Sequence, residues 1–496
     1  MLKFIDETLR DGPQSLWATR MRAETMLEAA PLLDGAGFSR ATVLSGASFE
    51  TAVKFLKEDP WERTRLVRQS LANTSVDVLI RGRNLFGWSR YSDDVVELLF
   101  KCLQRSGTNS IKIFDGLNDI STIAAHCRIG KNLGLHVTGI LTFSISPVHT
   151  DKYYCEKASE FIALGVDSIL VCDASGILTG ERTEALITAV QAATGNHTPI
   201  EFYAHASMGL AHESYRAALK GGVGGVTTAA EPLANGESLP ATADIARIAS
   251  ELGISTCLND VAVQQLDDYM YWAAYRENKP VGVPVAFDPA AYARFVEHQI
   301  PGGMISNFRG QLQEIGLLHR LDEVLHEAGR VRAELGYPIM VTPFSQFVGV
   351  QATLNVIEGE RYKTIPNEMR LFALGYYGNS GMAIEPNILD RILQGKSQKR
   401  MEADALYEQP TLEAFRNEHG PFTSDEELLL NLFYGRQVIE AMTREKVILP
   451  REVSIKQPLR LLIDELRKEA DLAMIRIEKR KGDTHAAHMQ LSMTFA

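Results

Sequence analysis

Residues 110–141 read SIKIFDGLNDISTIAAHCRIGKNLGLHVTGIL and contain one complete structural unit. A β-branched apolar run at 110–114 is followed by an amphipathic stretch at 122–134, and a second apolar run begins at 136. Gly134 stands just before that second run, where the C-terminal cap of a helix is expected. The pattern therefore predicts a strand, a helix and a second strand.

The same alternation extends over the first 250 residues of the chain. The strand-length runs lie at 2–5, 40–44, 76–80, 110–114, 136–141, 168–171, 200–204 and 225–228. Helical patterns occupy 22–35, 93–106, 122–134, 153–165, 181–194 and 211–221. Eight such units are typical of a (β/α)₈ barrel, and no G-x-G-x-x-G fingerprint or P-loop follows any run. We therefore expect an α/β protein with a TIM barrel over residues 1–280.

The second half of the chain has a different rhythm. After residue 280 the strand runs stop, and helical patterns follow at 310–335, 344–358, 424–433 and 458–480. Ser424 and Glu427 have the spacing of a capping box. We expect a helical C-terminal domain over 281–480, and a flexible tail over 481–496 because the helical pattern is lost there.

Composition narrows the class of protein. The chain has 496 residues, 45% of them hydrophobic, and a formal charge of −11, which argues against nucleic acid or an anionic membrane surface as the main partner. The N-terminus lacks the basic flank and apolar core of a signal peptide, and no transmembrane-length apolar run exists, so we expect a cytoplasmic protein with no membrane insertion. Five cysteines without a Cys-x-x-Cys pair indicate reduced, mostly buried thiols.

Barrel chemistry occurs at the C-terminal ends of the strands, so a few residues decide it. Tyr203 and His205 are two apart on one predicted strand and share a face. If that face is the barrel interior, they meet Asp6 and Cys172, and Asp, Cys and His together are competent zinc ligands. The alternative is that Cys172 is a small packed hydrophobe and His205 a hydrogen-bonded core residue.

Arg81 ends an apolar strand run and is followed by Gly82. A planar guanidinium at that position can bind a substrate carboxylate in bidentate fashion. A structural ion pair with a loop carboxylate is the alternative. Arg10 and Asp11, just after the first strand, are expected to pair with each other.

Several segments carry a resemblance to a known family. The chain resembles the carboxyltransferase component of biotin-dependent enzymes of the pyruvate carboxylase, oxaloacetate decarboxylase and transcarboxylase group. The matching segments are DETLRDGPQSLWATRMR (6–22), KEDPWER (57–63), IRGRNLFGW (80–88), IKIFDGLND (111–119), SPVHT (146–150), IPGGMISN (300–307), VTPFSQFVG (341–349) and ERYKT (360–364).

The resemblance implies a barrel followed by a helical funnel that covers the barrel mouth and carries a homodimer contact. It implies a carboxyl group exchanged between carboxybiotin on a separate carrier protein and a pyruvate- or oxaloacetate-like 2-oxo acid. By position, Thr342 would relay a proton with biotin, and Arg81 and Gln14 would hold the substrate. Lys112, which stands where the family usually has arginine, and Tyr203 would also line the substrate site.

The metal site is where this sequence departs from the family. Members are expected to hold a divalent ion through an aspartate matching Asp6, a carboxylated lysine and two histidines. Here Cys172 occupies the lysine position and Tyr203 that of one histidine, so only Asp6 and His205 remain. Two hypotheses follow: a reworked zinc or manganese site of Asp6, Cys172 and His205, or a pocket that works without a metal. In the second, His205 is a candidate general acid or base and Cys172 a candidate nucleophile.

A biotin attachment site needs a lysine between two methionines, but the nearest string, at 440–443, reads EAMT. Biotin is therefore not expected on this chain. Three functions stay open: a carboxyltransferase, a divergent decarboxylase, lyase or condensing enzyme acting on an enolisable acid, and a non-catalytic scaffold paralogue.

Overall fold

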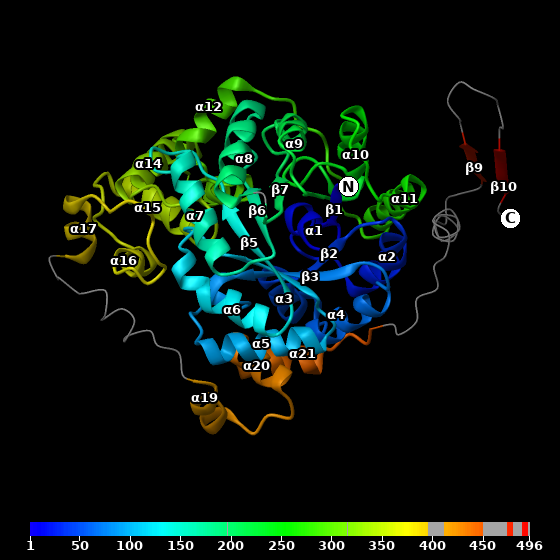
Figure 1. Cartoon of the computed structure of the whole chain (residues 1–496). Helices are drawn as coiled ribbons and strands as arrows, with labels where there is room; N and C mark the ends of the chain where they lie inside the picture. The colour runs from blue at the N-terminus through cyan, green and yellow to red at the C-terminus, as the bar shows by residue number, and fades with distance from the viewer. Residues whose placement is uncertain (196, 315, 395–410, 450–473, 480–488, 495–496) are drawn as a thin grey trace.

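The fold is seen in a computed structural model that describes residues 1–195, 197–314, 316–394, 411–449, 474–479 and 489–494. Eight parallel strands form a closed barrel in sequence order (Figure 1). They are β1 (Lys3–Asp6), β2 (Arg40–Ser45), β3 (Ser75–Arg81), β4 (Ser110–Phe114), β5 (His136–Thr142), β6 (Ser168–Asp173), β7 (Ile200–Ala204) and β8 (Gly225–Thr228). Pairing of β1 with β8 closes the sheet, so the predicted (β/α)₈ barrel is confirmed.

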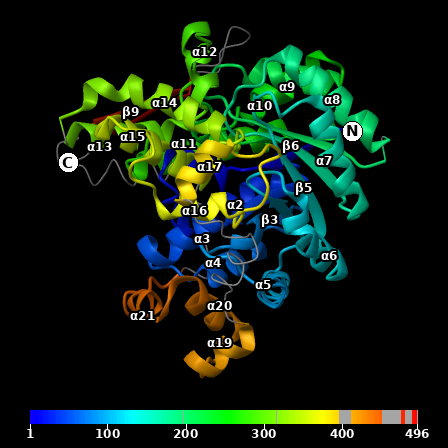
Figure 2. The same cartoon turned by 90° about the vertical axis from the view of Figure 1, so that its left-hand side faces the viewer.

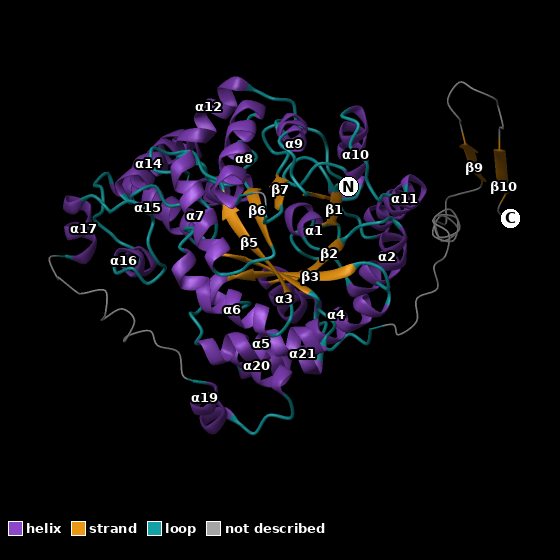
Figure 3. Ribbon diagram, viewed as in Figure 1, coloured by secondary structure: helices purple, strands orange, loops and turns teal. Residues whose placement is uncertain are grey.

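Helices follow the strands, and most of them surround the barrel on the outside, as Figure 3 shows by colour, whereas the first lies at the barrel mouth. They are α1 (Asp11–Leu16), α2 (Ala23–Gly35), α3 (Gly46–Thr51), α4 (Pro60–Gln69), α5 (Asp93–Arg105), α6 (Ala124–Asn132), α7 (Asp151–Ala163), α8 (Gly180–Thr194), α9 (Ala211–Lys220), α10 (Thr242–Glu251) and α11 (Asp260–Arg276). Short 3-10 turns η2 (Gly82–Asn84), η3 (Ile120–Ile123) and η4 (Glu231–Leu233) follow strands, and a π-helix, η1 (Ala52–Leu56), continues α3.

The remaining described helices follow the barrel in the sequence. They are α12 (Pro289–His298), α13 (Gly302–Glu314), α14 (Leu321–Glu334), α15 (Phe344–Glu358), α16 (Asn367–Ala373), α17 (Pro386–Leu393), α19 (Leu412–His419), α20 (Asp425–Tyr434) and α21 (Arg436–Arg444), with a 3-10 turn η5 (Leu318–Arg320). Those from α13 to α17 form a helical unit with its own core, in which Val331, Phe347 and Val348 are buried. The buried side chains of α20, such as Leu429 and Phe433, pack instead into the core of the barrel. Figure 2 shows α16 and α17 in front of the barrel and α19 to α21 below it.

Polar contacts fix the later helices to the barrel. Arg332 of α14 donates to Ser144 Oγ, after β5, at 2.9 Å. The Tyr434 hydroxyl of α20 donates to the carbonyl of Phe86, after β3, at 2.8 Å. These helices are therefore joined to the barrel next to several strand ends.

Two sequence expectations for these helices need correction. The stretch 310–335 is not one helix, because the chain turns at Gly316, whose φ of +72° favours glycine. Ser424 caps α20 by accepting from Glu427 N at 3.1 Å, but the Glu427 carboxylate accepts from Thr423 N instead of completing a capping box.

The C-terminal end also differs from the expectation. The expectation of a helix that extends to residue 480 is wrong, because its last residues form a strand, β9 (Met474–Lys479). This strand pairs antiparallel with β10 (Met489–Thr494), which lies within the expected flexible tail. In β9, Ile475 and Ile477 alternate with charged residues, which is the period of a strand. Residues 458–473 of the expected helix lie outside the described ranges.

Within the described ranges, no helix is long and apolar enough to span a membrane. The five cysteines are free: Cys102 and Cys127 are buried, Cys155 and Cys172 are half-buried, and Cys257 is exposed.

Candidate active site

The interior of the barrel contains a column of buried charges. Glu7, which follows β1, accepts hydrogen bonds from Lys112 Nζ at 2.6 Å and from Thr42 Oγ1 at 2.8 Å. Lys112 also donates to Thr42 at 2.8 Å and lies 3.2 Å from Asp77 Oδ2. Three oxygen atoms therefore surround an ammonium group that has three hydrogens and is 1% exposed. The expectation that Lys112 binds substrate is not supported, because its donors are engaged within the barrel.

The column continues upward to the barrel mouth through Arg10. Arg10 Nε donates to the second carboxylate oxygen of Glu7 at 2.6 Å, and Arg10 Nη1 donates to Asp11 Oδ1 at 2.9 Å. The expected Arg10–Asp11 pair is therefore confirmed. Burial would lower the pKa of Arg10, but the charges of Glu7 and Asp11 raise it well above its ordinary value.

Asp11 in turn faces two side chains of β7 and its following loop. The Tyr203 hydroxyl donates to Asp11 Oδ1 at 2.8 Å, and His205 Nε2 lies 3.2 Å from Asp11 Oδ2 and 2.8 Å from the Tyr203 oxygen. We refer to Asp11, Tyr203 and His205 as the mouth triad. These side chains are hydrogen-bonded to one another, and Asp11 and Tyr203 are buried.

Burial and charge set the protonation of the mouth triad. Burial alone would raise the pKa of Asp11, but Arg10 and His205 lower it below its usual range. Burial would lower the pKa of His205, but the charge of Asp11 and its hydrogen bond outweigh this and raise it. Burial raises the pKa of Tyr203 well above its ordinary value. The triad therefore combines a carboxylate, a neutral phenol and an imidazole that favours the protonated state.

Asp6 does not join this group. Its carboxylate accepts from Thr8 N at 3.0 Å and from Thr8 Oγ1 at 2.6 Å, while Glu7, the next residue, takes the interior position. Burial raises the pKa of Asp6 to about 7, and the charges of Glu7 and Asp267 add to the shift. The expected meeting of Asp6 with Tyr203, His205 and Cys172 is wrong, because adjacent residues at a strand end face opposite sides.

Cys172 lies beside Tyr203 in the register between β6 and β7. It packs against an apolar cluster that contains Ile140, Leu170, Tyr203 and Leu239. Burial raises the pKa of the Cys172 thiol, and the charge of Asp173 adds to this. A thiol in this environment stays neutral, which disfavours both nucleophilic attack and metal coordination.

The donors at the barrel mouth do not fit the divalent metal that the resemblance implies. Among the described residues, no group of three or more His, Cys, Asp or Glu side chains is arranged to hold a metal ion. Tyr203 is neutral and donates its proton to Asp11, and His205 Nε2 is engaged by the same carboxylate. A neutral phenol and a neutral thiol are poor replacements for a carboxylated lysine and an imidazole.

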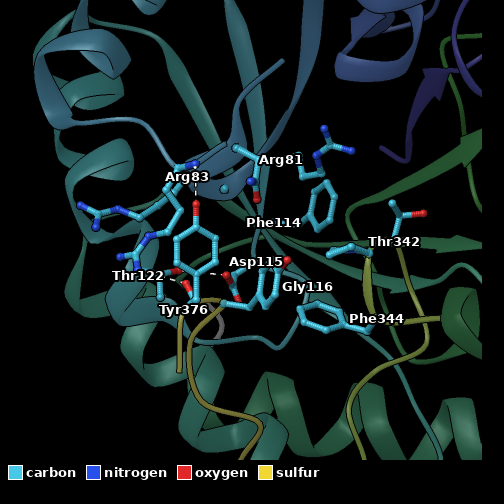
Figure 4. A pocket seen from close by; sticks show the side chains of 14 residues that line it. Arg81, Arg83, Phe114, Asp115, Gly116, Thr122, Thr342, Phe344 and Tyr376 are labelled. Carbon is cyan, nitrogen blue, oxygen red and sulfur yellow. Dashed lines mark hydrogen bonds between the residues drawn. The ribbon is translucent and has the colours of Figure 1, made fainter. Parts of the chain in front are cut away.

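A second polar site lies beside the mouth triad. It is a pocket between the ends of β3 and β4 and the helical unit (Figure 4). Its side chains include Arg81, Arg83, Arg90, Phe114, Asp115, Thr122, Thr342, Phe344, Tyr376 and Tyr377. We call it the arginine pocket. Phe114 also packs against the apolar cluster of Tyr203, so the two sites are neighbours.

Arg81 and Thr342 are thus brought to one pocket from positions 261 residues apart in the chain. Arg81 Nη2 donates to the Gly87 carbonyl at 2.5 Å, and its guanidinium lies 4.5 Å over the Trp88 ring. Its buried Nε has no hydrogen-bond partner among the described groups. The contacts that orient Arg81 therefore come from a carbonyl and a ring, and the alternative of a structural ion pair is not favoured.

Gln14 lies near the end of β2, where its Oε1 accepts from Ser45 Oγ at 3.3 Å. It comes from α1, the same short helix that carries Asp11. Gln14 is not among the side chains that line the arginine pocket.

Sequence reasoning did not identify Asp11, Arg83, Arg90 or Tyr376 as site residues. For Asp11 it predicts only an ion pair, because the turn that brings this residue over the barrel follows β1 and is not visible in a periodic pattern. Arg83 and Arg90 follow Arg81 closely in IRGRNLFGWSR (80–90), and that density of arginines after a barrel strand was the available signal.

Comparison with known proteins adds to this geometry. Residues 295–486 match a family model described as a conserved carboxylase domain. A pyruvate carboxylase subunit of Methanocaldococcus jannaschii is 38% identical over 393 residues, which are 79% of this chain and 68% of that protein. The methylmalonyl-CoA carboxyltransferase 5S subunit of Propionibacterium freudenreichii subsp. shermanii is 34% identical over 381 residues, covering 77% and 74% of the two chains.

A solved structure confirms the architecture. The carboxyl transferase domain (Y628A) of Rhizobium etli pyruvate carboxylase, determined with pyruvate, has a TM-score of 0.81 at 24% identity. The likeness covers 89% of this chain and 77% of that one. At this identity, the comparison supports the barrel fold and the helical unit that follows it.

Proposed function

Because the chain belongs to the family of carboxyltransferase subunits of biotin-dependent enzymes, we propose that it exchanges a carboxyl group between carboxybiotin and a 2-oxo acid. Biotin arrives on a separate carrier protein, and the acceptor is a pyruvate- or oxaloacetate-like acid. The observation that best supports this proposal is that Arg81 and Thr342, which lie far apart in the sequence, line one pocket beside the mouth triad.

Each residue has a distinct task in this reaction. Arg81, oriented by Gly87 and Trp88, binds the carboxylate of the 2-oxo acid. Gln14 helps to hold the substrate at the barrel mouth. The 2-oxo oxygen lies toward the barrel mouth, where the buried positive charge of Arg10 and the raised pKa of His205 favour negative charge developing on that oxygen.

Thr342 moves the proton that the exchange requires. In the direction of carboxylation, the N–C bond of carboxybiotin breaks and releases CO₂, and the ureido nitrogen takes a proton from the Thr342 hydroxyl, which takes one from the methyl group of the acceptor. The enolate carbon formed in this way then makes a new bond to the CO₂. The reverse sequence decarboxylates the product, so one hydroxyl serves both directions.

The decisive experiment is carboxyl exchange by the purified chain with a carboxylated biotin carrier protein and pyruvate, together with oxaloacetate decarboxylation with and without free biotin. Thr342→Ala should lower the exchange rate by about 10²-fold or more, while Thr342→Ser should retain most of it. A rate that does not depend on biotin would instead favour a decarboxylase, lyase or condensing enzyme. No turnover of any enolisable acid would favour a scaffold.

Metal content belongs to the same experiment. Elemental analysis of the purified chain should find no stoichiometric zinc or manganese, because the donors of the mouth triad are engaged with one another. If stoichiometric metal were found and were lost in the His205→Ala variant, the hypothesis of a reworked metal site would be supported again. We also propose a cytoplasmic homodimer, which size-exclusion chromatography with light scattering and cell fractionation would test.

A further inference from the structure

Thr342 lies on a segment that connects two helices of the helical unit. This connecting segment, residues 335–343, leads from the end of α14 to the start of α15. It turns sharply at Gly336 and Tyr337, whose φ angles are +79° and +57°. Because Thr342 is in neither helix, its position relative to the barrel depends on the contacts that hold this segment.

Arg332, in the last turn of α14, joins the connecting segment to the barrel. Its Nε donates to the Pro338 carbonyl at 3.2 Å. Its Nη2 donates to Ser144 Oγ at 2.9 Å and to the Ile145 carbonyl at 3.0 Å, both in the loop after β5. One guanidinium therefore ties the segment that carries Thr342 to the end of a barrel strand.

The Arg332 guanidinium is buried among neutral acceptors. Its residue is 2% exposed, and no carboxylate of the described residues acts on its pKa, which burial lowers to about 10. A buried charge without a counter-charge costs stability, so an apolar side chain would serve better if packing were its only role. The guanidinium supplies instead a planar fork whose donors hold two chain segments in a fixed geometry. This arrangement is better explained by positioning than by stability.

The other end of the connecting segment contacts the loop after β4. Phe344, two residues after Thr342, packs on Gly116 so closely that a Cβ atom there would lie 2.5 Å from Phe344 Cε2. The φ of Gly116 is not positive, so the close approach is what requires a glycine. In Figure 4, Thr342 and Phe344 lie together on one side of the pocket. Thr342 is therefore held between two contacts with the barrel, one at β4 and one at β5.

We propose that Arg332 is a positioning residue for Thr342: by fixing the connecting segment to the end of β5, it sets the place from which the Thr342 hydroxyl transfers a proton. This rests on the proposed function, in which Thr342 carries that proton. Arg332 is not among the residues that line the arginine pocket, so it acts through Thr342. Misplacing a reacting group by about 1 Å can cost about 10²-fold in rate, so the effect is expected in kcat. Binding of the 2-oxo acid depends on Arg81, which the barrel holds.

The test is a double-mutant cycle of Arg332 and Thr342 in the full chain, with carboxyl exchange between a carboxylated biotin carrier protein and pyruvate as the assay. Arg332→Gln alone should lower kcat about tenfold or more and change KM for pyruvate by less than about twofold. In the Thr342→Ala background, the same substitution should lower kcat by less than about twofold, because the hydroxyl that it positions is already absent. Equal losses in both backgrounds, or an unchanged kcat in Arg332→Gln, would overturn the proposal.

Arg361→Gln is the matched control, because Arg361 also binds α14. Its two Nη atoms donate to Glu334 at 2.6 and 2.8 Å, and its Nε donates to Glu327 at 2.6 Å. This variant should lower the melting temperature and keep kcat within about twofold of the wild type. A loss of kcat as large as that of Arg332→Gln would assign the effect to general loosening of α14 and overturn the proposal.

Two further results separate this proposal from the proposed function. If Thr342→Ala retains the wild-type rate, Thr342 does not carry the proton, and both fail at that point. If Thr342→Ala lowers the rate but Arg332→Gln does not, only the positioning proposal fails. If Arg332→Gln does not fold, Ser144→Ala decides, because it removes one acceptor of the guanidinium. That variant should lower kcat only where Thr342 is present, and an unchanged kcat would overturn the proposal.

Discussion

The mouth triad and the arginine pocket are neighbours at one barrel mouth, but their polar groups are satisfied in opposite ways. In the triad, Tyr203 and His205 both lie within hydrogen-bond distance of Asp11. In the pocket, Arg81 and Arg83 each retain a buried donor without a partner among the described groups. Groups that satisfy one another form a preorganised support, whereas the two arginines of the pocket are oriented by fewer polar contacts.

The largest effect is expected beneath the triad, where the buried column is densest. Lys112→Met would leave Glu7 and Asp77 buried without their shared counter-charge and should lower the free energy of unfolding by about 3–5 kcal/mol. Lys112→Arg, which keeps the charge, is the control. Urea denaturation measures both. A loss of less than about 1 kcal/mol in Lys112→Met would mean that the column is not held by this lysine.

The triad itself should show a pH dependence of stability. Because Asp11 raises the pKa of His205 above its ordinary 6.5, the stabilisation is fully present below that value and is lost as the pH rises through the folded pKa. Asp11→Asn should therefore cost about 2 kcal/mol more at pH 5.5 than at pH 9, measured by denaturant unfolding.

A matched surface pair provides the control for that experiment. His212 Nε2 also lies 3.2 Å from an aspartate, Asp244, but both side chains are about 40% exposed. Asp244→Asn should change stability by less than about 0.5 kcal/mol at either pH, because solvent screens exposed pairs. Equal effects of the two variants would contradict the view that burial makes the triad special.

In the arginine pocket the same kind of change should affect turnover and leave stability nearly unaltered. Arg81→Lys keeps the charge but loses the planar fork and its stacking on Trp88, so kcat/KM for the 2-oxo acid should fall about 10- to 100-fold. Steady-state kinetics and thermal unfolding measure the two quantities. Unchanged kcat/KM would remove Arg81 from substrate binding.

The smallest effect is expected at Cys172, which lies next to the triad without taking part in it. Since burial raises the pKa of its thiol, Cys172 should react with a thiol reagent at pH 8 far more slowly than the exposed Cys257. Cys172→Ala should leave turnover unchanged. A large loss of activity in that variant would restore the hypothesis of a nucleophilic thiol.

Much of the fold follows from local patterns. The apolar runs predict all eight barrel strands, and the helical stretches predict α2 and α5 to α9, each within about two residues. Amphipathic periods of 2 and 3.6 are properties of a short segment, but the helices α1, α3, α4, α10 and α11 are not predicted from them. The pattern fails where tertiary pairing decides. The helical period places Ile475 and Ile477 in a helix, but β9 exists because β10 supplies its hydrogen-bond partners.

The candidate site is predictable only in part. The sequence identifies Arg81, Thr342, Tyr203 and His205 as candidates, and the structure joins them in two neighbouring clusters. The sequence assigns Lys112 to the substrate site and Asp6 to a metal site, but Lys112 pairs with Glu7 inside the barrel and Asp6 accepts hydrogen bonds from Thr8. The type of a residue at a strand end indicates what chemistry its side chain could perform. Its hydrogen-bond partners decide which of its donors and acceptors remain available for a ligand, and those partners come from strands distant in the sequence.

The amino-acid sequence by itself determined the barrel, the helical unit that follows it, the acidic charge and the replacement of a lysine by Cys172 and a histidine by Tyr203. Only the tertiary structure decided that Asp11 rather than Asp6 faces Tyr203 and His205, and that Arg83 joins Arg81 in one pocket. The physical reason is that composition and period are local, whereas the facing of a side chain and the sharing of its hydrogen bonds depend on closure of the barrel.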